Sequence, residues 1–137
     1  MTALVADASV VVKCVLQECG SLTARDLAGT ADPLLAPALV VSEGSNAIWK
    51  AVHRRLLGCD EAWIALAALL AIPMRRLPLE ALASSAMSIA LQYDHPVYDC
   101  YYIAAAIQND ASLATADERL HDLAQRVGLG ERTILVR

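Results

Sequence analysis

Four carboxylates in this chain stand in different local contexts, each of which could direct an acid toward one shared point: Asp7, Glu43, Asp99 and Asp117. Carboxylates repel one another, so a cluster of them makes physical sense mainly around a hard cation. If the four side chains converge in the fold, they form a metal site. The protein would then carry out metal-assisted chemistry.

Each acid also has an ordinary structural explanation. Asp7 and Asp117 both precede predicted helices, and aspartate is a favoured N-cap. Asp99 falls in the first turn of a predicted helix, where a carboxylate suits the helix dipole. Glu43 begins a polar stripe on one helix face. No acid is diagnostic alone, so the elements that position the four decide whether they meet.

The hydrophobic pattern predicts these elements. Apolar runs too short for helices are expected to be buried strands, at residues 2–6, 34–36, 74–77, 112–115 and 133–136. Helices are expected between them, at residues 9–16, 21–29, 37–57, 60–71, 79–92, 96–108 and 117–127. Pro37 is expected to open the long third helix and Gly58 to follow its end, because proline favours the first helical position and glycine the position after the last.

Short strands that alternate with helices imply right-handed crossovers and a parallel sheet covered on both faces. We therefore expect an α/β fold, a three-layer sandwich with a central, mostly parallel sheet of four to five short strands, in one domain over residues 1–137. In such sheets, ligands bind beyond the carboxyl ends of the strands. Asp7 and Asp117 follow the first and fourth predicted strands, which places them at that edge.

The composition argues against a membrane protein. Hydrophobic residues make up 57% of the chain, but the longest apolar stretch, residues 62–74, is too short to cross a bilayer. The N-terminus shows no basic leader, since an acid appears at position 7. A cytoplasmic protein with no membrane partner is therefore expected. The apolar excess in residues 56–77 suggests the surface of a homodimer.

The charge balance is consistent with a metal site. Fifteen acids against eleven bases give a formal net charge of −4. Without the four acids above, the remaining eleven acids balance the eleven bases. Bound divalent cations would therefore leave a nearly neutral protein. This weakens the objection that an acidic protein should avoid nucleic acid, although the sequence shows no basic stripe.

Other kinds of site find little support. The four cysteines form no C-x-x-C pair and have no accompanying histidine cluster, so reduced core cysteines are expected and not zinc ligands. No Gly-x-Ser-x-Gly segment supports a serine hydrolase, and no glycine-rich turn of a dinucleotide-binding fold follows the first strand. A phosphatase on a similar sheet would need a nucleophilic aspartate motif such as D-x-D, which is missing.

Four short blocks each contain one of the acids, at residues 5–13, 37–46, 98–106 and 113–120. In sequence and order they resemble the PIN-domain ribonucleases, most closely the VapC-type toxins of VapBC toxin–antitoxin pairs. The third block is the most specific, and the resemblance runs over essentially the whole chain. Gly44 departs from the family, which tends to carry a larger aliphatic residue there. Since glycine inside a helix costs about 1 kcal/mol relative to alanine, this turn is expected to be loose or to lie close to a neighbour.

The resemblance implies a metal-dependent endoribonuclease that cleaves RNA phosphodiester bonds with a metal-activated water. Asp7, Glu43 and Asp99 would hold one Mg²⁺ or Mn²⁺, and Asp117 would complete the site or help to place a second ion. The implied partners are an RNA substrate, such as a loop of transfer or ribosomal RNA, and a cognate antitoxin that inserts a basic side chain into the acidic pocket. A second hypothesis is a PIN fold that has lost its chemistry and serves only as an interaction module. The intact acids argue against it.

Three polar residues beside the acids are predicted to support them. Ser9 and Thr115 could donate hydrogen bonds to a carboxylate or to a metal-bound water, although a helix cap or a strand-end hydrogen bond also explains them. Asn46, one turn beyond Glu43, could orient Asp7 or Glu43.

Overall fold

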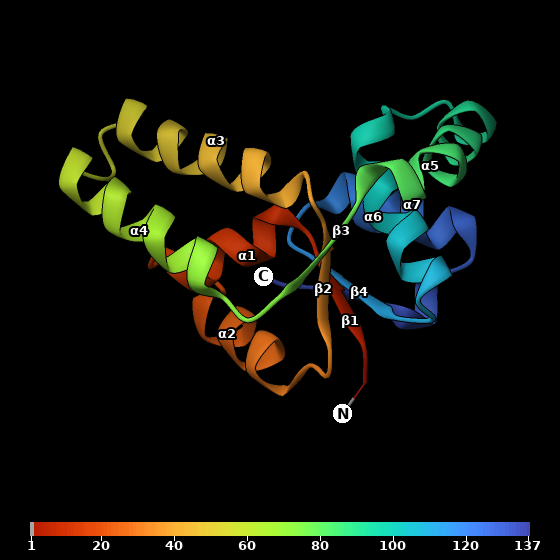
Figure 1. Cartoon of the computed structure of the whole chain (residues 1–137), viewed down its shortest axis with the longest axis horizontal. Helices are drawn as coiled ribbons and strands as arrows, with labels where there is room; N and C mark the ends of the chain where they lie inside the picture. The colour runs from red at the N-terminus through yellow and green to blue at the C-terminus, as the bar shows by residue number, and fades with distance from the viewer. Residues whose placement is uncertain (1) are drawn as a thin grey trace.

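The computed structural model of the protein describes residues 2–137. Within them, five parallel strands form a central sheet in the order β3-β2-β1-β4-β5 (Figure 1). The strands are β1 (Leu4–Ala6), β2 (Leu34–Pro37), β3 (Arg75–Leu77), β4 (Ser112–Thr115) and β5 (Thr133–Leu135). The helices are α1 (Ala8–Val15), α2 (Ser21–Thr30), α3 (Val40–His53), α4 (Cys59–Ala71), α5 (Leu79–Tyr93), α6 (Val97–Gln108) and α7 (Glu118–Val127), with a short 3-10 helix, Gly130–Arg132, before β5.

The helices form two layers, with α1 to α4 on one face of the sheet and α5 to α7 on the other (Figure 1). Side chains of β1 alternate between the layers, since Leu4 and Ala6 are buried with the first and Val5 with the second. Because both faces are covered in the middle of the sheet, β1 and β2 are continuous apolar runs. The predicted three-layer α/β fold with a parallel sheet is confirmed.

Most predicted boundaries lie close to the observed ones, but the prediction of residues 37–57 for the third helix is wrong. Helix α3 spans Val40–His53. Pro37 is instead the last residue of β2. It lies beyond Leu34 and Leu35, which pair with β1, and the N–H of Ala38 continues the bonding to β3. At the other end, Arg55 adopts a left-handed backbone conformation with φ 60°. This conformation ends the helix before Gly58, which becomes the N-cap of α4.

Helices α3 and α4 pair as a hairpin that projects to one side of the molecule (Figure 1). Helix α4 buries Ala65 and Leu69, whereas Trp63, Ile64 and Leu70 are exposed. No helix within residues 2–137 is both long enough and apolar enough to cross a membrane.

Gly44 lies where α3 packs against α4. A Cβ atom at this position would come within 2.5 Å of Leu69 Cδ1, and Leu69 is fully buried. The glycine therefore permits a close approach of the two helices, which explains the departure from the larger residue of the family. The cost of glycine in a helix is offset by the packing that it allows.

We predict that Gly44→Val destabilises the protein by about 1–3 kcal/mol, because the new side chain overpacks the contact with Leu69. Gly29→Ala is the matched control, since a Cβ atom there has no neighbour within 4 Å. This control should leave the stability unchanged or raise it by up to about 1 kcal/mol. Urea unfolding of both variants measures the difference, and equal stabilities would contradict the close packing of α3 on α4.

Candidate active site

The carboxyl ends of the central strands form the edge where the predicted acids lie. Strand β1 stands between β2 and β4. Strands β2 and β3 lie on one side of it and β4 and β5 on the other, so the direction of strand addition reverses there. Such a switch point in strand order is where parallel α/β sheets bind ligands. Asp7 follows β1 directly, Asp117 lies two residues beyond β4, and Glu43 stands in the first turn of α3 after β2. Asp99 reaches the edge from the other helical layer, in the first turn of α6.

Asp7 is buried, with 6% of its surface exposed. Its Oδ1 accepts hydrogen bonds from Ser9 Oγ at 2.5 Å and from the Val10 backbone N–H at 3.1 Å. Its Oδ2 accepts a hydrogen bond from Thr115 Oγ1 at 2.6 Å. Asp7 is thus the N-cap of α1, as predicted for a structural aspartate. It is also bonded to β4 through Thr115, which is distant in sequence.

The two hydroxyl groups extend this arrangement to the start of α7. Ser9 Oγ accepts a hydrogen bond from the Ala116 backbone N–H at 2.9 Å, and Thr115 Oγ1 accepts one from the Asp117 backbone N–H at 2.9 Å. Asp117 in turn caps α7 by accepting a hydrogen bond from the Arg119 N–H at 2.8 Å. Ser9 and Thr115 therefore orient Asp7 and hold the segment that carries Asp117.

The other two acids are each held by a side chain of the second helical layer. The hydroxyl group of Tyr102 donates a hydrogen bond to Glu43 Oε1 at 2.6 Å. Tyr102 lies on α6 and is 2% exposed, so this bond joins α3 to α6 across the end of the sheet. His95 Nε2 lies 2.8 Å from Asp99 Oδ2. Each acid therefore has a defined orientation.

The acids influence one another in two pairs. Burial, with a smaller contribution from the charge of Asp117, raises the pKa of Asp7 from 3.8 to about 6 despite the hydrogen bonds from Ser9 and Thr115. Burial also raises the pKa of Glu43, with Asp99 adding to the effect and the Tyr102 bond opposing it. The pKa of Tyr102 is raised by burial and by the charges of Glu43 and Asp7. One acid of each pair thus acts on the phenol.

The donor set fits a hard divalent cation. All four acids offer oxygen ligands, which Mg²⁺ and Mn²⁺ prefer. Across residues 2–137, no Lys, Arg or His nitrogen lies within 4.0 Å of the Asp7 carboxylate, so its buried charge lacks a cationic partner. In this part of the chain, no three His, Cys, Asp or Glu side chains lie close enough together to hold a metal ion as they stand. A shared ion would therefore require the four acids to come closer together.

Comparison with known proteins identifies the family. Residues 4–126 match the PIN domain. The chain belongs to the PIN domain family. The structure of VapC20 from Mycobacterium tuberculosis, a toxin that cleaves the sarcin-ricin loop, is similar with a TM-score of 0.67 and 16% identity, over 93% of this chain and 96% of that one. PAE2754 from Pyrobaculum aerophilum is similar with a TM-score of 0.69 and 21% identity, over 98% and 90% of the chains. No curated protein sequence matches the chain.

Two residues of this PIN domain site were not predicted from the sequence, His95 and Tyr102. Both lie near Asp99, at spacings of four residues before it and three after it, so the position of Asp99 was the signal that could have found them. Asn46 is exposed, and none of the hydrogen bonds found within residues 2–137 joins it to Asp7 or Glu43. Its supporting role stays a prediction.

We predict that, in the absence of metal, the wild type loses stability relative to Asp7→Asn as pH rises from about 4 to about 7. Burial raises the pKa of the Asp7 carboxyl group to about 6 in the folded chain from its ordinary value of 3.8. The folded state therefore binds more protons in this window, and wild-type stability falls through it by up to about 3 kcal/mol. Asparagine does not titrate, so this loss of stability is missing in the variant. Urea unfolding across pH tests this, and a constant difference would contradict it.

Proposed function

We propose that this PIN domain is a metal-dependent endoribonuclease and the toxin of a toxin–antitoxin pair. The observation that carries the proposal is the buried Asp7 carboxylate, which accepts hydrogen bonds only from neutral donors, follows the strand at the switch point of the sheet and is acted on by the charge of Asp117. A buried charge without a partner is costly, and a bound cation would offset that cost. Membership of the PIN domain family supports the same assignment.

The fold similarity to VapC20 supports RNA as the substrate class. That toxin cleaves the sarcin-ricin loop, and the similarity covers nearly the whole of both chains. We propose a structured or single-stranded RNA, such as a loop of ribosomal or transfer RNA. An enzyme with such a substrate would act in the cytoplasm.

We assign roles to the chain's own residues as follows. Asp7, Glu43 and Asp99 would hold Mg²⁺ or Mn²⁺, with Asp117 completing the site or helping to place a second ion. Such an ion, when bound, lowers the pKa of a coordinated water and offsets charge on the phosphate oxygens. Three neutral or weakly basic donors, Thr115, Tyr102 and His95, would keep the acids oriented. Because the hydroxyl donors carry no charge, they fix geometry without replacing the cation.

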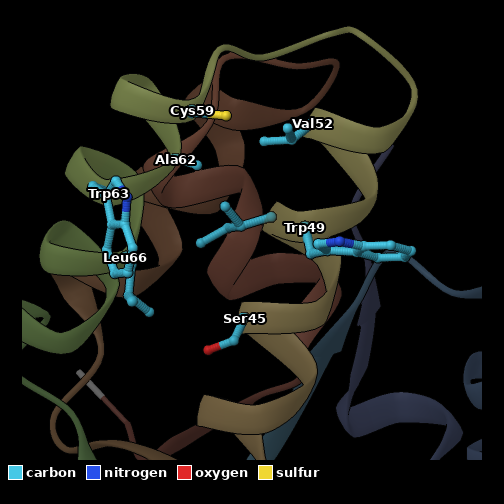
Figure 2. A pocket seen from close by; sticks show the side chains of 8 residues that line it. Ser45, Trp49, Val52, Cys59, Ala62, Trp63 and Leu66 are labelled. Carbon is cyan, nitrogen blue, oxygen red and sulfur yellow. The ribbon is translucent and has the colours of Figure 1, made fainter.

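Two protein partners complete the proposal. A cognate antitoxin would insert a basic side chain among the acids, where the buried charge of Asp7 attracts it. A second copy of the chain would cover the apolar side of the α3–α4 hairpin. An open hollow of about 290 Å³ lies between the two helices and is lined mainly by apolar side chains, including Trp63 and Leu66 of α4 (Figure 2). Trp63 lines the hollow and is exposed, and Ile64 and Leu70 of the same helix are exposed as well, which supports the homodimer.

We predict that the wild-type protein cleaves total RNA when Mg²⁺ or Mn²⁺ is present and that Asp99→Asn lowers the cleavage rate by roughly a hundredfold or more, as loss of a ligand should exceed the effect of losing its supporting residue. Asp94→Asn is the matched control. It makes the same substitution five residues earlier, at an exposed position with φ 50° that asparagine tolerates. This variant should cleave like the wild type.

Mapping of the cut ends in both metals would define the cleavage site. If the folded wild type cleaves neither total RNA nor isolated ribosomal RNA in either metal, the nuclease proposal is refuted. The hypothesis of an interaction module would then remain. Equal rates for Asp99→Asn and Asp94→Asn would remove Asp99 from the site.

We predict that Mg²⁺ or Mn²⁺ raises the melting temperature of the chelator-treated wild type, because the ion binds only the assembled acids. At a hundredfold excess over the dissociation constant, the gain is about 2.7 kcal/mol. Asp7→Asn should lose most of this shift, while Asp94→Asn should keep it. A wild-type melting curve that millimolar metal leaves unchanged would count against a shared metal site.

A further inference from the structure

A groove leaves the candidate active site between α1 and α3. It has a volume of about 290 Å³. One end is lined by Ser9 and Ala116, which are hydrogen-bonded to each other beside Asp7. Farther along, side chains of α1 and α3 form the two walls, among them Lys13 on α1 and Lys50 and Arg54 at the end of α3. The groove therefore begins beside Asp7.

The charge of this groove is opposite to that of the acids. Lys13, Lys50 and Arg54 line it together with one acid, Glu18. Lys13 Nζ lies 3.3 Å from Glu18 Oε1 and donates to the Cys19 carbonyl at 2.6 Å, so these two charges compensate each other. Lys50 and Arg54 are exposed, and no carboxylate of residues 2–137 lies within 4.0 Å of their nitrogens. Two positive charges thus remain uncompensated.

Helix α3 connects the acids with these bases. Lys50 and Arg54 lie seven and eleven positions after Glu43 and share its face of the helix. With a rise of 1.5 Å per residue, they stand about 10 Å and about 16 Å beyond Glu43 along the axis. A polyanion with one phosphate at the acids would pass both bases if it followed this face.

The other hollow beside α3 has a different character. Ser45, Ile48, Trp49 and Val52 of α3 line the cavity toward α4, and none of its lining residues is charged. Figure 2 shows the Trp49 indole extending from α3 on the side away from α4. An apolar cavity offers no counter-charge to phosphate, so of these two hollows the basic groove is the one that suits a nucleic acid.

We propose that the groove between α1 and α3 binds the sugar–phosphate backbone of the RNA strand that is cut, with Lys50 and Arg54 as phosphate contacts. This inference rests on the proposed nuclease function. An RNA strand that is cut at the acids must continue along some surface beyond them. This groove begins beside Asp7 and carries positive charge, opposite to that of the phosphates. Phosphate contacts position a strand without reading its bases, so the groove sets the path of the strand and leaves base selection to other contacts.

The test is binding of a short fluorescein-labelled oligouridylate with 2′-O-methyl groups, which resist cleavage, measured by anisotropy in Mg²⁺ over a range of salt concentrations. Lys50→Gln/Arg54→Gln should weaken binding about tenfold or more at low salt. The slope of log affinity against log salt should shrink by about 1.4, since each phosphate contact to a single strand contributes about 0.7. Lys50→Arg/Arg54→Lys keeps both charges and should retain binding.

Arg75→Gln/Arg126→Gln is the matched control and removes the same charge elsewhere. Arg75 is exposed on β3 at the outer edge of the sheet, and Arg126 lies on α7 over the Tyr93 ring. This variant should bind like the wild type, and melting curves confirm that all variants are folded.

Equal affinities and salt slopes for Lys50→Gln/Arg54→Gln and the control would overturn the groove, even in a protein that cleaves RNA. Wild-type binding with the expected loss in the variant, but without cleavage of any RNA, would support the groove and refute the nuclease. Stronger displacement of the probe by poly-L-glutamate than by unlabelled oligouridylate would overturn the assignment to RNA and favour an acidic protein segment.

Discussion

The structure depends on a carboxylate buried at the end of its central strand. Asp7 is withdrawn from water, and burial raises its pKa to about 6. Burial of such a group is tolerated only when its hydrogen bonds are satisfied, and the donors come from the start of α1 and from the end of β4. The end of β1 can receive both, because β1 lies beside β4 in the middle of the sheet and runs directly into α1.

The donors to the acids explain how the site can be orderly and still attract a cation. A lysine or arginine beside Asp7 would compensate its charge and remove the electrostatic need for an ion. Thr115 and Tyr102 instead donate hydroxyl groups to Asp7 and Glu43, which fix the oxygens and leave the net charge in place. The Tyr102 bond also ties α6 to α3 from opposite layers, so the position of Glu43 depends on the whole sandwich.

The sequence predicts the fold and the placement of three acids because these features are local. Asp7 and Asp117 follow apolar runs that can only be strands, and Asp99 stands three residues after a helix-starting proline. The bond between Tyr102 and Glu43 spans 59 positions, so the spacing of Tyr102 from Asp99 could indicate the residue but not its partner. The groove leaves no local pattern, since Lys13 and Arg54 come from different helices and the sequence alone shows no basic stripe. Pro37 misled the prediction of α3 because proline suits a strand end as well as a helix start.

Helix α3 contributes to the acids, to the packing against α4 and to the basic groove, with different positions along its length. Its first turns carry Glu43 to the acids, and Gly44 lets α4 approach. Its last turns carry Lys50 and Arg54, about 10–16 Å farther along the axis. That separation matters in an acidic protein, because the Debye length at physiological ionic strength is about 8 Å. Screening therefore limits how far the acids can cancel the positive potential of the bases, and a net charge of −4 is compatible with a locally basic path for a polyanion.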